Sequence, residues 1–564
     1  MAVAPAKAAS ASACTIIFFR DMSVPRLQLA ALECNPRAES GILAPRVRDQ
    51  SSRMLARISS GAVIGVDAMR VEVEVDVANG LPCIHVVGLP EGAVREGRER
   101  VTAALNNSGF AVPPRRITVN LAPADVRKDG SAFDLAIAIG ILAATGVVAP
   151  EAAARFCFLG ELGLDGDLRP VRGVLPIVLR SSREGCEQAI VPVGNAAEAA
   201  VVTTMKVYGA ATLLEVVQLI REGGGVPTQV DVASLLRNAA LQHDVDYSDV
   251  KGQEHARRAL EIAAAGQHNV LLVGPPGSGK SMLARRLPTI MPPLTAAEAV
   301  EVTKIHSVAG RLRPGQALVT ARPFRAPHHT ISDAGLVGGG STPRPGEASL
   351  AHHGVLFLDE LPEFRRHVLD ALRQPIEDGA VLIGRARAAI NYPARFMLAA
   401  AMNPCPCGYH GDGRARCTCH IAQVERYLAR VSGPLLDRID LHIEVPALSG
   451  KELTRLDPGE ASENIRARVL EARARQLARL GDRGIFANAQ MSARDVRELC
   501  VVDERGLSLL RSAIQRLGLS ARAYHRVLRL ARTIADLQGK GNIAAAHIAE
   551  AIQYRTLDRR TVTA

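Results

Sequence analysis

Three observations predict a multidomain α/β protein. The chain of 564 residues contains a complete phosphate-binding loop, short apolar runs that alternate with helical segments around it, and a C-terminal region rich in Ala, Leu, Arg and Glu at helical spacing. Strands that alternate with helices favour a parallel sheet covered on both faces. We therefore expect an α+β domain over residues 54–225, a linker over 226–245, an α/β core over 246–446 and a helical domain over 447–564.

The first 53 residues differ from the rest of the chain. Met1–Ala13 is rich in Ala and Ser, and no clear periodicity follows before Arg53. The apolar stretch Cys14–Phe19 is too short for a secretory signal. We interpret this segment as a disordered tail or, preferably, as an over-extended gene start with the true initiator at Met54.

The composition is that of a basic protein with a large core. Hydrophobic residues make up 48% of the chain, and the formal net charge of +11 suits a polyanionic partner. Because the chain has no Trp and only 3% aromatic residues, nucleic acid would be held by its phosphates rather than on a base-stacking platform. No apolar run reaches about 18 residues, so no membrane span is expected. Cysteines without a disulfide framework indicate reduced thiols and a cytoplasmic location.

The sequence pattern over residues 54–225 predicts both half-buried strands and a buried helix. Val71–Val77 alternates apolar and acidic residues, as a half-buried strand does. Arg116–Leu121 and Ala189–Val193 are also predicted strands, whereas Asp134–Thr145 is predicted to be a buried helix. In the following core, four apolar runs are predicted strands: 269–273, 354–358, 396–401 and 440–445.

The phosphate-binding loop reads G-P-P-G-S-G-K-S and lies between a predicted strand and a predicted helix over Met282–Leu287. This strand–loop–helix context is what the motif requires. Glycines let the backbone approach a polyphosphate, whose charge the loop N–H groups and a lysine neutralise. The residues predicted to contact ATP are Gly274, Pro275, Pro276, Gly277, Ser278, Gly279, Lys280 and Ser281.

Two acids follow the apolar run Val355–Leu358. Asp359 at the strand end is predicted to hold magnesium together with the hydroxyl of Ser281. Glu360 is placed to polarise the attacking water. The pair lies 79 residues after Lys280, a normal separation for these two motifs.

Three further polar residues are candidates for contacts with the γ-phosphate. Asn403 ends a buried strand and is predicted to orient the attacking water. Arg438 follows a helical stretch and is predicted to project into the nucleotide of a neighbouring subunit, where it would offset transition-state charge. Arg522 is the preferred second phosphate-contacting arginine, with Arg526 in reserve.

Four cysteines, Cys405, Cys407, Cys417 and Cys419, fall within fifteen positions. Tetrahedral zinc takes four thiolates, so a structural zinc site is one interpretation and a reduced cysteine-rich loop is the other. The histidine pairs 328–329 and 352–353 are not expected to chelate one ion each, because adjacent residues on a strand point to opposite faces.

Three long motifs resemble the AAA+ ATPases of the magnesium-chelatase-like branch, and more closely the ComM/YifB family of competence proteins. They are P-F-R-A-P-H-H-T at 323–330, P-G-E-A-S-L-A-H-H-G at 345–354 and N-P-C-P-C-G at 403–408. The resemblance covers residues 54–560 and implies a homohexameric ring that binds ATP and magnesium between subunits, with residues 447–564 as a helical lid. It also implies ATP-driven movement along branched or single-stranded DNA, with branch migration during natural transformation as the proposed role.

The resemblance further implies a hairpin aimed at the central pore of the ring. The segment 378–387 suits that hairpin, and Arg385 and Arg387 near its tip are candidate DNA contacts. Two alternatives stay open: a chelatase-type or protein-remodelling ATPase without DNA translocation, and a nucleotide-gated scaffold. A scaffold needs no water-activating acid, so Glu360 argues against the second.

The first domain resembles the Lon-protease-like fold. Lys128-Asp129-Gly130-Ser131-Ala132 is similar to the nucleophile loop K-D-G-P-S-A but one residue shorter. Lon-type proteases need a lysine that activates the serine, and Leu175 stands where that lysine is expected. We therefore expect no peptidase activity and a structural role for Ser131.

Overall fold

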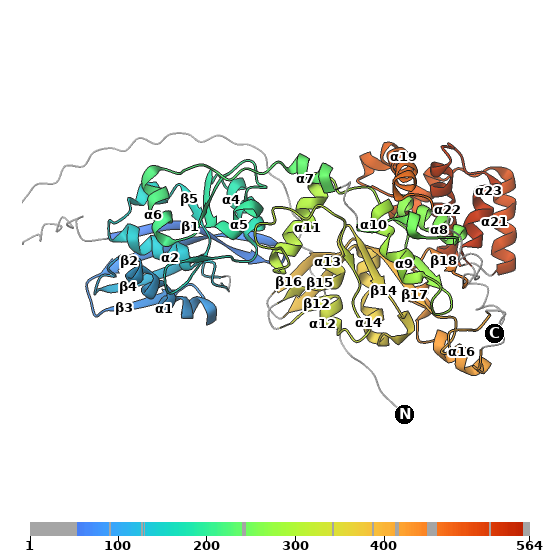
Figure 1. Cartoon of the computed structure of the whole chain (residues 1–564), viewed down its shortest axis with the longest axis horizontal. Coiled ribbons are helices and arrows are strands. Elements are labelled where there is room, and N and C mark those ends of the chain that lie inside the picture. The colour runs from blue at the N-terminus through green and yellow to red at the C-terminus, as the bar shows by residue number, and fades with distance from the viewer. Residues whose placement is uncertain are drawn as a thin grey trace, which may run out of the picture. The chain divides into compact units, whose positions relative to one another are not determined.

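The computed structural model describes residues 54–89, 92–125, 128, 130–239, 244–340, 343–385, 388–411, 417–447, 459–517 and 520–555 (Figure 1). The interpretation of residues 1–53 therefore falls outside the described part of the chain. Within that part, the structure is a mixed α/β fold with two principal sheets and a helical C-terminal region.

The first sheet has seven strands in the order β3-β4-β2-β1-β5-β8-β9 and mixes parallel with antiparallel pairs. Its strands are β1 (Met54–Ile64), β2 (Asp67–Ala78), β3 (Cys83–Val87), β4 (Arg116–Ala122), β5 (Phe156–Phe158), β8 (Gln188–Pro192) and β9 (Lys206–Ala210). Along β2 the valines at 71, 73, 75 and 77 are buried, which confirms the predicted alternation. Two-residue strands β6 (Glu161–Leu162) and β7 (Leu168–Arg169) form a separate pair.

Seven helices accompany this sheet among the described residues. They are α1 (Gly92–Asn107), α2 (Asp134–Ala144), α3 (Pro150–Ala153), α4 (Val174–Arg183), α5 (Val193–Ala199), α6 (Leu213–Glu222) and α7 (Val232–Ala239). Helix α2 is buried along its whole length, as the apolar run that follows Asp134 predicts. It packs against β1 and β2 and so forms the centre of this part of the core.

The second sheet is entirely parallel, with five strands in the order β11-β14-β17-β10-β18. Its strands are β10 (Val270–Val273), β11 (Phe324–Arg325), β14 (Val355–Leu358), β17 (Met397–Met402) and β18 (Leu441–Glu444). The four strands predicted in this region are confirmed, and each lies fully buried apart from the end of β18. Helices α8 (Glu254–Gly266) and α9 (Lys280–Arg285) precede and follow β10.

The register of the parallel strands determines which residues lie together at the carboxyl edge of this sheet. Val273 pairs with Met402 on one side and with Glu444 on the other. Leu358 pairs with Ala400. The segments that follow β10, β14 and β17 therefore start close together, at the carboxyl edge where open α/β sheets bind ligands.

Two insertions leave this core between β10 and β17. The first contains α10 (Leu287–Ile290), α11 (Ala296–Val308), α12 (Asp333–Leu336), α13 (Glu347–Leu350) and the short antiparallel pair β12 (Gly338–Gly339) and β13 (Arg344–Pro345). The second follows α14 (Arg366–Ala371) and α15 (Arg373–Asp378) and is an antiparallel hairpin of β15 (Ala380–Arg385) and β16 (Ala388–Pro393). A hairpin was expected over 378–387, whereas the observed hairpin spans 380–393, because its second strand begins only at Ala388.

The remaining described helices are α16 (Ile421–Leu428), α17 (Gly433–Leu436), α19 (Ser462–Leu480), α20 (Ala493–Leu499), α21 (Glu504–Leu517), α22 (Ala521–Leu537) and α23 (Ala545–Gln553). Helices α19 and α22 pack on α8, so the helical region shares one hydrophobic cluster with a face of the parallel sheet. None of the described helices combines the length and apolarity that a bilayer crossing requires.

A buried carboxylate holds the helical region together. Asp536 on α22 is 1% exposed and accepts hydrogen bonds from Arg479 Nη2 (2.7 Å), Arg532 Nε (3.1 Å) and Asn488 Nδ2 (2.8 Å). Removal of one partner from a buried ion pair leaves an uncompensated charge. This carboxylate therefore links α19 to α22 in addition to the apolar contacts between the two helices.

Asp536→Ala is expected to lower the free energy of unfolding of the helical region by about 3–5 kcal/mol, because Arg532 stays buried without its carboxylate. Chemical denaturation followed by circular dichroism measures the change. The matched control is Glu471→Ala, which removes an exposed pair with Arg475 and is expected to cost no more than about 1 kcal/mol. Equal losses in the two variants would contradict this assignment.

Candidate nucleotide-binding site

The phosphate loop is shaped by glycines at its close contacts. A Cβ on Gly274 would lie 2.1 Å from the carbonyl oxygen of Val445, the residue after β18, so no side chain fits there. Gly277 and Gly279 have φ values of +77° and +90°, which L-residues rarely adopt. The loop thus turns back over the end of β10 and delivers Lys280 to the first position of α9.

Lys280 lies almost buried inside the loop. Its Nζ donates to the carbonyl oxygens of Gly274 (2.7 Å) and Pro275 (2.8 Å) and to Oδ1 of Asn403 (3.2 Å). Burial lowers the pKa of this ammonium, and attraction to Asp359 opposes that shift. The structure therefore brings two of the predicted γ-phosphate contacts, Lys280 and Asn403, together across the β10–β17 pair.

Ser281 and Asp359 meet at the same edge. The Ser281 hydroxyl donates to Oδ2 of Asp359 at 2.6 Å, which joins the start of α9 to the end of β14. Hydroxyl and carboxylate oxygens are the hard ligands that magnesium prefers, usually together with water and substrate phosphates. The pair fits a magnesium ion bound with the phosphates of ATP.

Glu360 follows Asp359 directly, and its described side-chain contact is with His329 rather than with Ser281. Its backbone has φ +53°, a left-handed conformation, and its N–H donates to Oδ1 of Asp359 at 2.9 Å. The side chain is 58% exposed, with Oε2 3.4 Å from Nδ1 of His329. The two consecutive carboxylates thus have different surroundings: Asp359 is hydrogen-bonded to Ser281, whereas Glu360 is largely exposed beside His329. The contact with His329 was not predicted, although its motif was part of the family resemblance.

The second histidine pair corrects the sequence-based expectation. His352 and His353 precede β14 in a turn rather than on a strand, and their ring centroids lie 4.0 Å apart. Both Nε2 atoms approach the same Oε2 of Glu301, at 3.2 Å and 2.9 Å. The strand alternation that was assumed to separate the two rings does not apply here. Because Nδ1 of His352 accepts the Arg395 N–H, the neutral ring carries its proton on Nε2 and donates to Glu301.

Arg438 and Arg522 lie in a separate cavity of about 670 Å³, which none of the residues 274–281 lines. Arg438 is held there by Glu377 (2.7 Å) and by the carbonyl oxygen of Pro434 (2.6 Å). Arg522 is exposed, whereas Arg526 is mostly buried and donates to the carbonyl oxygen of Ile439. Arg526 lines the same cavity, and the choice of Arg522 over Arg526 stays a prediction.

Asn269, just before β10, connects strand β17 with the backbone of Arg438. It was not predicted as a functional residue. Its Oδ1 accepts the Leu398 N–H of β17 at 2.8 Å, and its Nδ2 donates to the carbonyl oxygen of Arg438 at 3.0 Å. Its own N–H donates to the buried carboxylate of Asp440. A polar residue just before an apolar strand was the signal available in the sequence.

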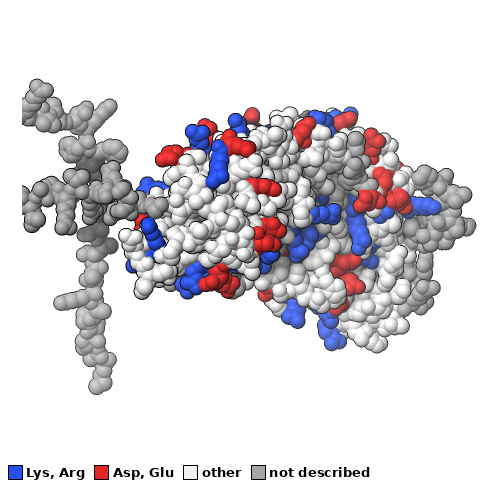
Figure 2. All heavy atoms as spheres, turned by 60° about the vertical axis from the view of Figure 1, so that its left-hand side comes forward, with Lys and Arg blue, Asp and Glu red and all other residues white. Residues whose placement is uncertain are grey.

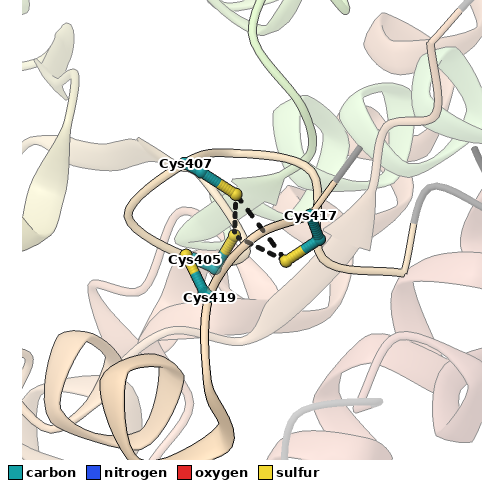
Figure 3. Close-up of side chains that lie close together, drawn as sticks. All are labelled: Cys405, Cys407, Cys417 and Cys419. Atoms are coloured by element: carbon teal, nitrogen blue, oxygen red, sulfur yellow. Dashed lines mark hydrogen bonds between the residues drawn. The ribbon is translucent and has the colours of Figure 1, made fainter. Parts of the chain in front are cut away.

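The four cysteines converge, as Figure 3 shows. The sulfur of Cys405 lies 3.3 Å from that of Cys407 and 3.9 Å from that of Cys417, and all four sulfurs lie within 4.8 Å of one another. Four thiolates at about 2.3 Å around tetrahedral zinc would be about 3.8 Å apart. The His410 N–H also donates to the sulfur of Cys405 at 3.3 Å, as expected for a bond that supports a metal ligand. The donor set therefore fits zinc.

The candidate DNA contacts are described only in part. Arg385 is the last residue of β15, and the structure gives its backbone alone. Arg387 lies outside the described residues. Their role stays a prediction.

A parallel sheet with the strand order 2-3-4-1-5, counted along the core, carries a phosphate loop after its first strand and an acidic pair after its third. These features define a P-loop ATPase of the AAA+ class. The family model described as "Magnesium chelatase, subunit ChlI" matches residues 246–453. Models described as "Subunit ChlI of Mg-chelatase" and "Magnesium chelatase, subunit ChlI C-terminal" match residues 73–195 and 459–555.

The chain belongs to the ComM/YifB family of magnesium-chelatase-like proteins. It is 47% identical over 508 residues to competence protein ComM of Haemophilus influenzae, which covers 90% of this chain and 98% of that protein. It is 43% identical over 509 residues to YifB of Escherichia coli, with 90% and 98% covered. It is 28% identical over 255 residues to the magnesium-chelatase 38 kDa subunit of Rhodobacter capsulatus, with 41% and 69% covered. The family resemblance expected from the motifs is thus confirmed.

Glu360→Gln is expected to leave ATP bound but to slow its hydrolysis by about 100-fold or more, because the amide cannot take a proton from water. Radiolabelled ATP turnover and nucleotide retention measure the two effects. The control is Glu363→Gln, which removes only an exposed pair with Arg430 and is expected to leave turnover unchanged. Normal hydrolysis by Glu360→Gln would show that another group activates the water.

Proposed function

We propose that the chain is an ATP-hydrolysing motor that acts on DNA as a homohexamer, with branch migration during natural transformation as its role. The observation that carries the ATPase part is the convergence of Lys280 with Asn403 and of Ser281 with Asp359 at one edge of the parallel sheet. The proposal for DNA draws on the relative named as a competence protein, which matches nearly the whole described chain.

The two arginines support a nucleotide site shared between protomers. Arg438 and Arg522 line one cavity, and the phosphate loop lies outside it. Positive charge that does not face the protein's own loop is suited to the nucleotide of a neighbour. In this proposal Arg438 exchanges Glu377 for the γ-phosphate when two protomers meet.

The proposed DNA contacts are Arg385, the last residue of β15, and Arg387, two positions further along the chain. The formal net charge of +11 favours a polyanionic partner. Figure 2 shows basic and acidic side chains interspersed on the face that it presents. The contact is therefore assigned to the hairpin rather than to that face as a whole.

The remaining parts of the proposal concern cofactors and the first domain. Magnesium would bind with ATP at Ser281 and Asp359, and a structural zinc at the four cysteines. We propose a cytoplasmic location and no peptidase activity. Leu175 is fully buried, and the Ser131 hydroxyl donates to the carboxylate of Glu161, so the described contacts of this serine include no activating lysine.

ATP turnover is expected to rise when branched or single-stranded DNA is added, and the protein is expected to be retained on DNA at low salt. The paired variant Arg385→Ala/Arg387→Ala should weaken retention and flatten its salt dependence, since fewer phosphates are neutralised. Arg430→Ala, which removes a surface arginine paired with Glu363, is the control. ATP turnover without any response to DNA would favour the chelatase-type or protein-remodelling alternative.

A mixing experiment tests the shared site. Lys280→Ala and Arg438→Ala are each expected to be inactive, but an equal mixture should recover about one quarter of the normal rate, because random pairing leaves that share of seams intact. A mixture of Arg438→Ala with the double variant Lys280→Ala/Arg438→Ala should stay inactive. Failure of the first mixture to recover, with mixed assemblies demonstrated by pull-down, would place Arg438 outside the neighbour's site.

A further inference from the structure

The cysteine cluster is continuous with the nucleotide site. Asn403, which accepts the hydrogen bond of Lys280, is only two residues before Cys405. The chain then passes through Cys407 to Gly408. This short segment therefore begins at the residue that contacts the phosphate-loop lysine. It then supplies the first two of the four cysteines.

The same segment returns to the phosphate loop at Gly408. Its φ of +88° is a glycine conformation, and a Cβ built there would lie 2.5 Å from Cδ and 2.7 Å from Cγ of Pro276. Pro276 is the third residue of the loop, and its ring cannot move without the loop backbone. Gly408 therefore packs against the loop without room for a methyl group.

A third contact fixes the other end of the cluster. Cys419 is followed by α16, on which Tyr427 is buried. Burial raises the pKa of Tyr427 to about 12, so its hydroxyl is neutral, and the nearby backbone of Asn403 opposes that shift. The segments on both sides of the cysteines thus lie near the position of Asn403.

We propose that a thiophilic divalent ion such as zinc, held by Cys405, Cys407, Cys417 and Cys419, positions Asn403 and Pro276 and thereby sets the affinity and turnover of ATP. The inference rests on the proposed ATPase function and on the proposed zinc site. The four cysteines act as positioning residues, because none of them contacts the phosphate loop in the way that Gly408 and Asn403 do.

The physical reason is the small number of other restraints on this segment. Between Cys405 and Cys419 the described residues form no helix or strand, so no ladder of backbone hydrogen bonds fixes their position. A tetrahedral ion would join the two cysteine pairs across ten to fourteen positions of the chain and remove most of that conformational freedom. With the ion bound, the Gly408–Pro276 contact becomes a rigid support for the loop.

Two glycine variants separate the effect of the Gly408–Pro276 contact from the backbone strain of placing alanine at a positive φ. Gly408→Ala introduces a methyl group against Pro276, whereas Gly411→Ala has a similar φ of +81° with nothing within 4 Å of its Cβ. Gly408→Ala is expected to keep one zinc per chain but to weaken binding of a fluorescent ATP analogue by about tenfold or more. Gly411→Ala is expected to stay within about twofold of the unchanged protein in both measurements, since it carries the strain without the overlap.

Reversible metal removal from the unchanged full-length protein supplies the second test. An organomercurial would displace zinc, a zinc-sensitive dye would count it, and reducing agent with added zinc would restore it. Binding of the ATP analogue and ATP turnover should both fall by about tenfold or more and should both recover. Cys83→Ser, which changes a half-buried cysteine outside the cluster, is expected to behave as the unchanged protein does.

The outcomes distinguish the zinc site, the ATPase function and the coupling between zinc and ATP binding. Purified protein without bound metal would overturn the zinc site, and purified protein without ATP turnover would overturn the proposed function. Protein that loses its zinc but binds and hydrolyses ATP as before would overturn the coupling alone. The coupling would also be overturned if Gly408→Ala bound ATP as tightly as Gly411→Ala.

Discussion

The parallel register of β10 between β17 and β18 is the constraint on which the nucleotide site depends. Val273 lies opposite Met402 and Glu444, so the chain leaves all three strands at one level. β10 leads into the phosphate loop, and β17 leads into Asn403, which is why Lys280 reaches that amide. A shift of either strand by one residue would reverse the direction of its buried side chains, so the packing of the core resists it.

Burial of a lysine among these strands is tolerated because the surrounding loop supplies acceptors. The ammonium of Lys280 meets two loop carbonyl oxygens and one amide oxygen, which replaces the hydration that it loses. The loop backbone at Gly274 also lies so close to the chain after β18 that no side chain fits there. The loop therefore owes its shape to contacts with neighbouring strands, and Asn403 and Gly408 extend those contacts to the cysteine cluster.

Much of this core could be predicted from local sequence patterns, because apolar runs and the phosphate-loop motif are local signals. The two-residue strand β11 could not, since its pairing with β14 depends on tertiary contacts alone. The orientation of His352 and His353 was predicted wrongly because the pair was assumed to lie on a strand, whereas it lies in a turn before one. The pairing of Arg438 with Glu377 and the packing of Gly408 on Pro276 join residues 61 and 132 positions apart, and no spacing rule reveals such contacts. The domain limits and the catalytic roles stay predictions.

The central claim is that ATP is hydrolysed where two copies of the chain meet, with the loop of one facing the arginine-lined cavity of the other. The most direct measurement is the specific rate of ATP hydrolysis over a wide range of protein concentration, with the assembly state followed by sedimentation. The account predicts that the rate per chain rises with assembly and then becomes constant. A constant rate per chain down to concentrations at which the protein sediments as a monomer would contradict it.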